Sequence, residues 1–291
     1  MKIYHCVESY YPAVGGMQEV VKQLSERLVK LGHEVTVLTR KHDKREFKEL
    51  NGVKIIEFAI DGNPIIPVKP EDHRYISFLL ELKGDVITFF AAQQWATNLA
   101  LPILQKIALK KVSVPTGYSG LYWPTFKKYY EDMKQFIHHY DMNVYLSDDY
   151  RDINYARDNG VKNLTLIPNG AAEDEFLAED KINIRKELGL KESDFILLLV
   201  GSYTGWKGHK EAIEMFLNIK TENVVLLMIG NNYQYFRISP KKQPVLFFKY
   251  FWNKCFGKKK IIFNFYSREF TVAAYKQANL FLCPSNVECS P

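Results

Sequence analysis

The stretch LLLVGSYTGWKGHKEAIEMF, residues 197–216, contains the pattern that decides the fold. An apolar run ends at Gly201, a loop with further glycines follows, and after Gly208 apolar residues recur at helical spacing. A buried strand that leads through a glycine-containing loop into a helix is typical of α/β proteins, in which parallel strands alternate with helices. The stretch therefore predicts a strand–loop–helix unit inside an α/β domain.

The same alternation extends to both sides of this stretch. KIYHCVE, EVVKQLSERLVKLG and HEVTVLTR predict a strand, a helix and a strand, that is, a βαβ unit at the N-terminus. Further strands are expected at 53–60, 85–90, 111–117, 142–148, 163–170, 195–202, 224–231, 261–267 and 279–285. Further helices are expected at 91–110, 126–140, 148–160, 183–190, 208–220 and 269–278. In the first helix, one apolar face is expected to comprise Val20, Val21, Leu24, Leu28 and Leu31.

This arrangement, over 291 residues, predicts two α/β domains of similar build. We expect the first at 1–168 and the second at 169–291, with a linker around IPNGAAEDEF, residues 167–176. Ligands of such sheets bind beyond the carboxyl ends of the strands, so the natural place for a site is a cleft between the two domains.

The composition is that of an ordinary globular protein, with a net charge of +6 and a pI of about 8.9. Its four cysteines show no metal-ligand spacing, and we expect Cys6 and Cys283 to be small core residues of a reduced, cytoplasmic protein. No apolar run approaches the length of a membrane span, so any membrane contact is expected to be peripheral.

Lys207 is the strongest candidate for a chemical role. It is expected to bring a positive charge to the carboxyl end of a strand, beside the backbone amides of a helix start, which suits a diphosphate. A solvated lysine is the alternative, but the helix dipole disfavours a cation there. The loop lacks the GKS/T ending of a P-loop.

Two other places have a functional and a structural interpretation. Val14-Gly15-Gly16 precedes a helix and would let backbone approach an anionic ligand, or it is simply a tight turn. Glu288 follows the last expected strand and would bond a sugar hydroxyl, or it is an ordinary acid at a helix start.

The segment 241–260 mixes lysines with a large aromatic load between two expected strands. One interpretation is a basic aromatic surface that lies on anionic lipid. The other is an aromatic helix that packs on its own domain and leaves its lysines solvated. Nucleic-acid binding has no recognition motif to support it.

The chain resembles retaining glycosyltransferases of the GT-B fold, in glycosyltransferase family four. The resemblance covers nearly the whole chain and rests on PAVGGMQEVVKQLSERLVKLGHEVTVLT, IPNG, LLLVGSYTGWKGHKEAIEMF, LLMIG and ANLFLCPSNVE in this order. It implies two Rossmann-like domains and transfer of a sugar from a nucleotide-sugar to an acceptor, with retention and without a metal or other cofactor. It places the donor in the C-terminal domain and the acceptor mostly in the N-terminal domain.

The resemblance also implies roles for particular residues. Gly15 and Gly16 would approach the donor diphosphate, Lys207 would stabilise the departing diphosphate, and Glu288 matches the first acid of the family's E-x7-E motif. Gly201 and Ser202 would border the donor, although Ser202 stands where the family usually has an arginine.

Two further departures from the family pattern concern a histidine and the last acid. Tyr118 or Ser119 stands near the place of a usual histidine, which makes Tyr118 a catalytic candidate. The second acid would fall at position 296, so we expect the C-terminal domain to be incomplete.

The leading hypothesis is therefore a cytoplasmic glycosyltransferase that uses a UDP- or GDP-linked sugar and a glycan or lipid-linked acceptor in cell-surface polysaccharide synthesis. An impaired member that binds a nucleotide-sugar or glycan, and a GT-B UDP-sugar epimerase, are the alternatives. The missing arginine, histidine and tail favour the impaired member, and ANLFLCPS with its following acid favours the transferase over the epimerase.

Overall fold

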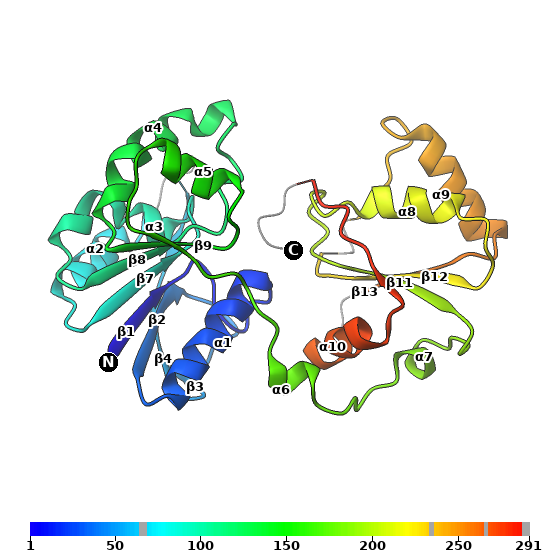
Figure 1. Cartoon of the computed structure of the whole chain (residues 1–291), viewed down its shortest axis with the longest axis horizontal. Helices are drawn as coiled ribbons and strands as arrows, with labels where there is room; N and C mark the ends of the chain where they lie inside the picture. Colours follow the sequence, from blue (N-terminus) through cyan, green and yellow to red (C-terminus); the bar gives the residue numbers. More distant parts are fainter. Residues whose placement is uncertain (64–68, 233–235, 265–266, 287–291) are drawn as a thin grey trace. The chain divides into compact units, whose positions relative to one another are not determined.

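The chain forms two compact units in a computed structural model that describes residues 1–63, 69–232, 236–264 and 267–286. The first unit comprises Met1–Asn169 and the second begins at Gly170. Each unit is built on its own sheet (Figure 1), and each is described here by itself.

The first unit contains an eight-stranded sheet in the order β10-β9-β8-β7-β1-β2-β4-β3. All neighbouring strands pair in parallel except β3 and β4, which are antiparallel. The same unit contains a two-stranded antiparallel ribbon, which is formed by β5 and β6. The strands are β1 (Lys2–Cys6), β2 (Glu34–Arg40), β3 (Glu49–Leu50), β4 (Val53–Phe58), β5 (Ile60–Asp61), β6 (Lys69–Pro70), β7 (Val86–Phe90), β8 (Lys110–Val114), β9 (Met142–Tyr145) and β10 (Leu164–Leu166).

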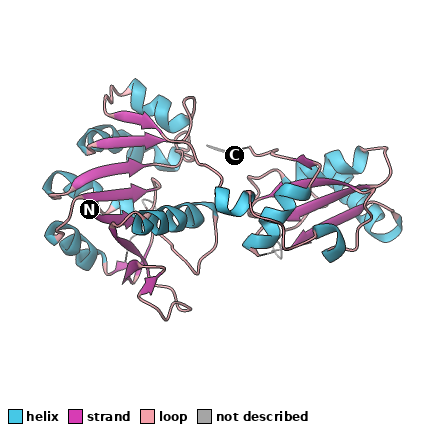
Figure 2. Cartoon of the chain, turned by 60° about the horizontal axis from the view of Figure 1, so that its bottom comes forward, coloured by secondary structure: helices cyan, strands magenta, loops and turns pink. Residues whose placement is uncertain are grey.

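Helices cover both faces of this sheet (Figure 2). One face packs on α1 (Gly16–Lys30), and the other packs on the remaining helices of the unit. These are α2 (Asp72–Glu81), α3 (Trp95–Asn98), α4 (Lys127–Phe136) and α5 (Arg151–Asp158), with 3₁₀ helices at Leu101–Lys106, Pro124–Phe126 and Ile137–His139. Alternate residues of β1 enter the two cores, because successive side chains of a strand point to opposite faces.

The second unit contains a parallel four-stranded sheet in the order β13-β12-β11-β14. Its strands are β11 (Phe195–Val200), β12 (Val224–Ile229), β13 (Lys260–Asn264) and β14 (Leu280–Phe281). Leu197 and Leu199 pack with α8 (His209–Asn218) and α9 (Pro244–Phe256), whereas Ile196 and Leu198 pack with α7 (Ile184–Glu187) and α10 (Arg268–Gln277). The short helix α6 (Glu173–Phe176) precedes them. A strand that is apolar on both faces is expected for such a sheet.

The expected alternation is present, but three local predictions are wrong. The helix expected at 91–110 is a four-residue α3 followed by a 3₁₀ helix, since Pro102 cannot donate a hydrogen bond to a continuous helix. The buried line of α1 is formed by Val21, Ser25 and half-buried Leu28, whereas Val20, Leu24 and Leu31 are exposed. Cys283 is exposed in a loop, whereas Cys6 is buried as expected. The helix α2 has no counterpart among the sequence predictions.

Candidate functional site: the carboxyl ends of the parallel strands

The chain direction across the second sheet reverses between β11 and β14. From β11 the chain adds β12 and then β13 on one side, and it returns to place β14 on the other side of β11. In open α/β sheets the crevice outside the strand ends at such a reversal is the usual ligand site, because the loops that follow the two strands turn to opposite faces. The loops concerned are Gly201–Gly208 after β11 and Leu282–Asn286 after β14.

Lys207 lies against the end of β11. A Cβ atom placed on Gly201 would come 3.0 Å from the Lys207 Cγ atom, so the aliphatic stem of the half-buried lysine passes directly over this glycine. The residue after β12 lies close to the residue after β11, since a Cβ atom on Gly230 would come 1.9 Å from the Gly201 carbonyl oxygen. Gly230 is therefore required by the close approach of the Gly201 backbone, whereas Gly201 leaves room for the Lys207 side chain at the strand end.

The loop after β14 packs on the loop after β11. Gly208 has a left-handed φ of +69°, and a Cβ atom there would lie 2.1 Å from the Pro284 carbonyl oxygen. The backbone N–H of Asn286 donates to the Trp206 carbonyl oxygen at 2.9 Å. The last described residues are thus fixed against the Lys207 loop. Glu288, the predicted donor ligand, lies outside the described residues.

His209 follows this loop at the start of α8 and is buried. Its ring stacks on Tyr203 at 4.0 Å between centroids, and its Nε2 atom lies 3.2 Å from the Gly201 carbonyl oxygen. Burial lowers the pKa of His209, and the nearby Lys207 charge acts in the same direction. A neutral imidazole that donates Nε2–H to Gly201 satisfies this geometry, because a carbonyl oxygen can only accept. His209 thereby ties the helix start to the end of β11.

In the first unit the chain direction reverses between β1 and β7. Gly15 is extended, and Gly16 begins α1 with open space around the position of a Cβ atom. Beyond β1, the backbone N–H of Glu8 lies 3.4 Å from the Gln94 side-chain oxygen. Burial raises the pKa of the Glu8 carboxyl group. Gly15 thus ends the loop that follows the central strand β1, and Gly16 is the first residue of α1.

Strained backbone follows β7 and β8 in this unit. Ala91, Gln93 and Thr116 have φ values of 61°, 63° and 56°. Left-handed conformations cost free energy in residues other than glycine, and they cluster at functional sites. The Gln93 side-chain oxygen accepts from the backbone N–H of Gly120 at 3.3 Å, which joins the two loops.

Asp152, at the start of α5, holds the loop after β8 by a hydrogen bond. Its carboxylate accepts a hydrogen bond from the Gly117 backbone N–H at 2.8 Å. The carboxyl group is buried, and burial raises its pKa, while hydrogen bonds from Gly117 and Ile153 oppose this rise. The loop is therefore held by a buried acceptor.

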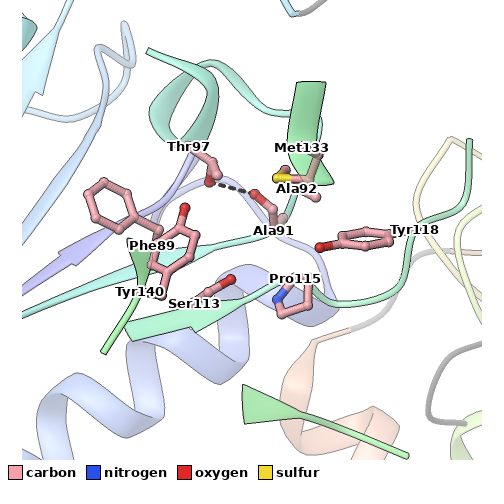
Figure 3. A pocket seen from close by; sticks show the side chains of 9 residues that line it. All are labelled: Phe89, Ala91, Ala92, Thr97, Ser113, Pro115, Tyr118, Met133 and Tyr140. Carbon is pink, nitrogen blue, oxygen red and sulfur yellow. Dashed lines mark hydrogen bonds between the residues drawn. The ribbon is translucent and has the colours of Figure 1, made fainter. Parts of the chain in front are cut away.

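Tyr118 lies inside the first unit rather than on its surface. Its side chain is 2% exposed and contacts the rings of Tyr130 and Tyr155 at 5.1 and 5.3 Å between centroids. The neighbouring hollow, lined also by Ala91 and Pro115, has no volume open to a water molecule (Figure 3). Burial raises the pKa of Tyr118. The ring therefore has a packing role, and the burial weighs against the catalytic role that the sequence suggested.

The comparisons with known proteins agree with this geometry. The model of glycosyltransferase family 4 matches residues 14–175, and that of the glycosyl transferases group 1 matches residues 180–291. The chain belongs to glycosyltransferase family 4. The uncharacterized glycosyltransferase MJ1607 of Methanocaldococcus jannaschii is 26% identical over 254 residues, which are 79% of this chain. The chain spans 63% of the length of that relative.

Solved structures place this family 4 chain in the GT-B fold. Sucrose-phosphate synthase from Thermosynechococcus elongatus matches with a TM-score of 0.73 and 16% identity, over 100% of this chain and 77% of the other. HepE of Anabaena, in complex with UDP-glucose, matches with a TM-score of 0.70 and 12% identity, over 99% and 74%. WaaG, a glycosyltransferase of lipopolysaccharide biosynthesis, matches with a TM-score of 0.64 and 17% identity, over 99% and 76%. The predicted fold class is confirmed.

Of the predicted site residues of this family 4 chain, Gly201, Ser202 and Lys207 lie together at the end of β11. Gly15, Gly16 and Tyr118 belong to the first unit. Sequence reasoning missed His209, whose only signal was its place two residues after Lys207. It also missed Gly230 and Asp152, which are recognised only by their contacts.

Within the described residues, no helix is long and apolar enough to cross a membrane. Among the same residues, no group of three or more histidine, cysteine or acidic side chains is arranged to hold a metal ion.

Proposed function

We propose that this protein transfers a sugar from a nucleotide-sugar to a glycan or lipid-linked acceptor, with retention of the anomeric configuration and without a metal ion. Membership of glycosyltransferase family 4 supports sugar transfer. HepE binds UDP-glucose, and WaaG acts in lipopolysaccharide synthesis, which supports a UDP-linked donor and a cell-surface product. The proposal places the reaction in the cytoplasm.

The position of Lys207 is the observation that carries this proposal. Its stem crosses Gly201 at the reversal between β11 and β14, and the start of α8 follows immediately. When a glycosidic bond to a diphosphate breaks, negative charge develops on the departing phosphate oxygens. An ammonium group and the N-terminal amides of a helix, both fixed before the reaction, would stabilise that charge. They would interact more strongly with the transition state than with the bound donor before the reaction.

The proposal gives roles to the other predicted site residues as well. Gly201 and Ser202 would border the diphosphate, Glu288 would bond the donor sugar, and Gly15 and Gly16 would approach the diphosphate. Stabilisation by one fixed donor group is worth about 10²-fold or more in turnover. Lys207 is therefore expected to affect turnover more than donor affinity.

The experiment compares Lys207→Ala with the matched control Lys220→Ala, which removes the same charge beyond the opposite end of α8. A thermal-shift screen of UDP- and GDP-sugars identifies the donor, since a ligand that binds only the folded protein raises its stability. Turnover is then measured as nucleoside diphosphate released in the presence of acceptor. We expect Lys207→Ala to lose about 10²-fold or more and Lys220→Ala to match the wild type. Equal turnover in both variants would refute the role of Lys207.

Ser202 favours a second candidate, a member that binds the nucleotide-sugar without transferring it, because serine cannot replace an arginine clamp on phosphate. Donor binding without diphosphate release would select this candidate. Release of a free or epimerised sugar would instead select a UDP-sugar epimerase.

A further inference from the structure

The helix α9 exposes an apolar stripe that its own unit leaves uncovered. Val245, Phe248, Trp252 and Phe256 occupy positions i, i+3, i+7 and i+11 and therefore share one face. They are 64, 66, 67 and 71% exposed. We call these four residues the α9 stripe. The Trp252 and Phe256 rings contact each other at 4.9 Å between centroids.

The stripe is not the result of a poorly anchored helix. The opposite side of α9 packs into the core of the second unit, where Leu246 is 4% exposed and Phe247 and Tyr250 are half-buried. The helix lies beside α8, as Figure 1 shows in orange and yellow. Phe248, Trp252 and Phe256 of the stripe also line an open groove of about 710 Å³, together with Phe251 and with Leu217 of α8. The outward face is therefore a fixed and extensive apolar surface.

Along the chain, the charged residues near the stripe have a single sign. Between Glu222 and Glu269 the sequence contains nine basic residues and no acidic residue. Lys249 lies beside the stripe on α9, where its ammonium group donates to the Asn218 side-chain oxygen at 2.8 Å, and Lys241, Lys242 and Lys258 lie just beyond the ends of the helix. Within the described part of the chain, the side chains of Lys241, Lys242 and Lys258 form no hydrogen bond or ion pair. Their charges are available to an anionic partner.

Two lysines of the segment 241–260 bond to backbone carbonyl oxygens of their own unit and do not add charge beside the α9 stripe. The Lys259 ammonium group donates to carbonyl oxygens at the end of α8, including that of Phe216 at 2.9 Å. Lys260 donates to the Leu188 carbonyl oxygen at 3.0 Å. These two lysines stabilise the unit itself, which leaves the other lysines to define the outward charge.

We propose that α9 is a membrane-interface helix that lays the α9 stripe into the headgroup region of an anionic bilayer. Tryptophan and phenylalanine prefer this region, and lysines beside them attract anionic lipid. A helix of 13 residues is about 20 Å long and is suited to lie in the interface rather than to cross it. A bilayer fits this surface better than a folded partner, because unpaired lysines around an apolar stripe match headgroups above acyl chains. The proposal does not depend on sugar transfer.

The test uses flotation of the whole chain with vesicles of phosphatidylcholine, alone or with about one third phosphatidylglycerol. We expect binding to the anionic vesicles at low salt and strong loss of binding in about 0.5 M NaCl, where charges are screened. Phe248→Ser with Trp252→Ser should abolish binding. Lys242→Gln with Lys258→Gln should weaken it about fivefold per lysine. The exposed pair Lys30→Gln with Lys106→Gln is the matched control and should bind like the wild type.

A second readout reports the depth of the stripe. With Trp123 and Trp206 replaced by phenylalanine, only Trp252 and the buried Trp95 emit, and the same protein with Trp252→Ser gives the contribution of Trp95. The difference between the two, which is the emission of Trp252, should shift to shorter wavelength on anionic vesicles and be quenched by brominated acyl chains. No vesicle binding by the wild type, or equal loss in the lysine control pair, would overturn the proposal. Concentration-dependent self-association that disappears in the Phe248→Ser, Trp252→Ser variant, without vesicle binding, would identify a second copy of the chain as the occupant and would also overturn it.

Discussion

Replacement of Gly208 by alanine tests the contact that joins the two loops of the candidate donor site. The new methyl carbon would lie 2.1 Å from the Pro284 carbonyl oxygen and 2.6 Å from its carbonyl carbon. Both are backbone atoms, so no side-chain rotation relieves the clash. To reach even 3.0 Å, the two loops must separate by about 0.9 Å. We expect this movement to break the hydrogen bond from Asn286 to Trp206.

The magnitude follows from two separable costs. A left-handed φ costs an alanine about 1–2 kcal/mol, and forced displacement of packed atoms costs about 1–3 kcal/mol more. Gly205→Ala is the matched control, because Gly205 has a φ of +90° and no atom within 4 Å of the added carbon. Gly205→Ala should therefore lose only the first amount, and Gly208→Ala about 2–5 kcal/mol in total.

The assay is guanidinium unfolding of each variant in a background with Trp95→Phe and Trp123→Phe, followed by fluorescence of Trp206 and Trp252 in the second unit, together with donor affinity by calorimetry. The free energy of unfolding of Gly208→Ala should be lower than that of Gly205→Ala by about 1–3 kcal/mol. Its donor affinity should also fall by about tenfold, since the loop before Glu288 moves. Equal stability and affinity in the two variants would refute the proposed docking of the loops.

Two further predictions concern side-chain nitrogen atoms that make hydrogen bonds inside their unit. Burial lowers the pKa of His5 from 6.5 to about 4. The unfolded chain therefore binds more protons between these values, and the stability of the first unit should fall by about 3 kcal/mol as pH drops from 6.5 to 4. His5→Gln should remove this dependence of the urea midpoint on pH, and exposed His138→Gln should keep it. Lys259→Met should lower the free energy of unfolding by about 2 kcal/mol, because the carbonyl oxygens at the end of α8 lose their donor. The control Lys258→Met should change it by less than about 0.5 kcal/mol in the same denaturation assay.

Much of the fold could be predicted because the buried strands carry their own signal. FILLLV and VVLLMI are apolar on both faces, which only a covered parallel sheet requires, and glycines mark the ends of both strands. Helix α2 was missed, and the helix expected at 91–110 is in fact two short helices, α3 and a 3₁₀ helix. In both places, apolar residues also occur in loops and short helices, so the periodicity of apolar residues alone does not decide where a helix begins and ends.

The candidate site was only half predictable for a different reason. Lys207 could be found because its loop and helix are contiguous in the sequence. The contact of Gly208 with Pro284 joins residues 76 positions apart, and local patterns carry no information about it. Tyr118 follows a strand in an aromatic loop, and the sequence does not tell whether its ring faces solvent or the cluster with Tyr130.

The direction in which α9 faces is a similar case. Its 13 residues are apolar nearly all round, so either side could have been buried. Only the packing of Leu246 on the second unit settles which side remains outside.

Sugar transfer itself is tested most directly by the products of one reaction. The protein is incubated with the nucleotide-sugar found by thermal shift and with a lipid-linked or glycan acceptor, and the anomeric proton of the product is observed by NMR. We predict stoichiometric release of nucleoside diphosphate and a glycoside with the anomeric configuration of the donor, both lost in Lys207→Ala and retained in Lys220→Ala. An inverted product, or donor that binds and stays intact with every acceptor offered, would contradict the proposed function.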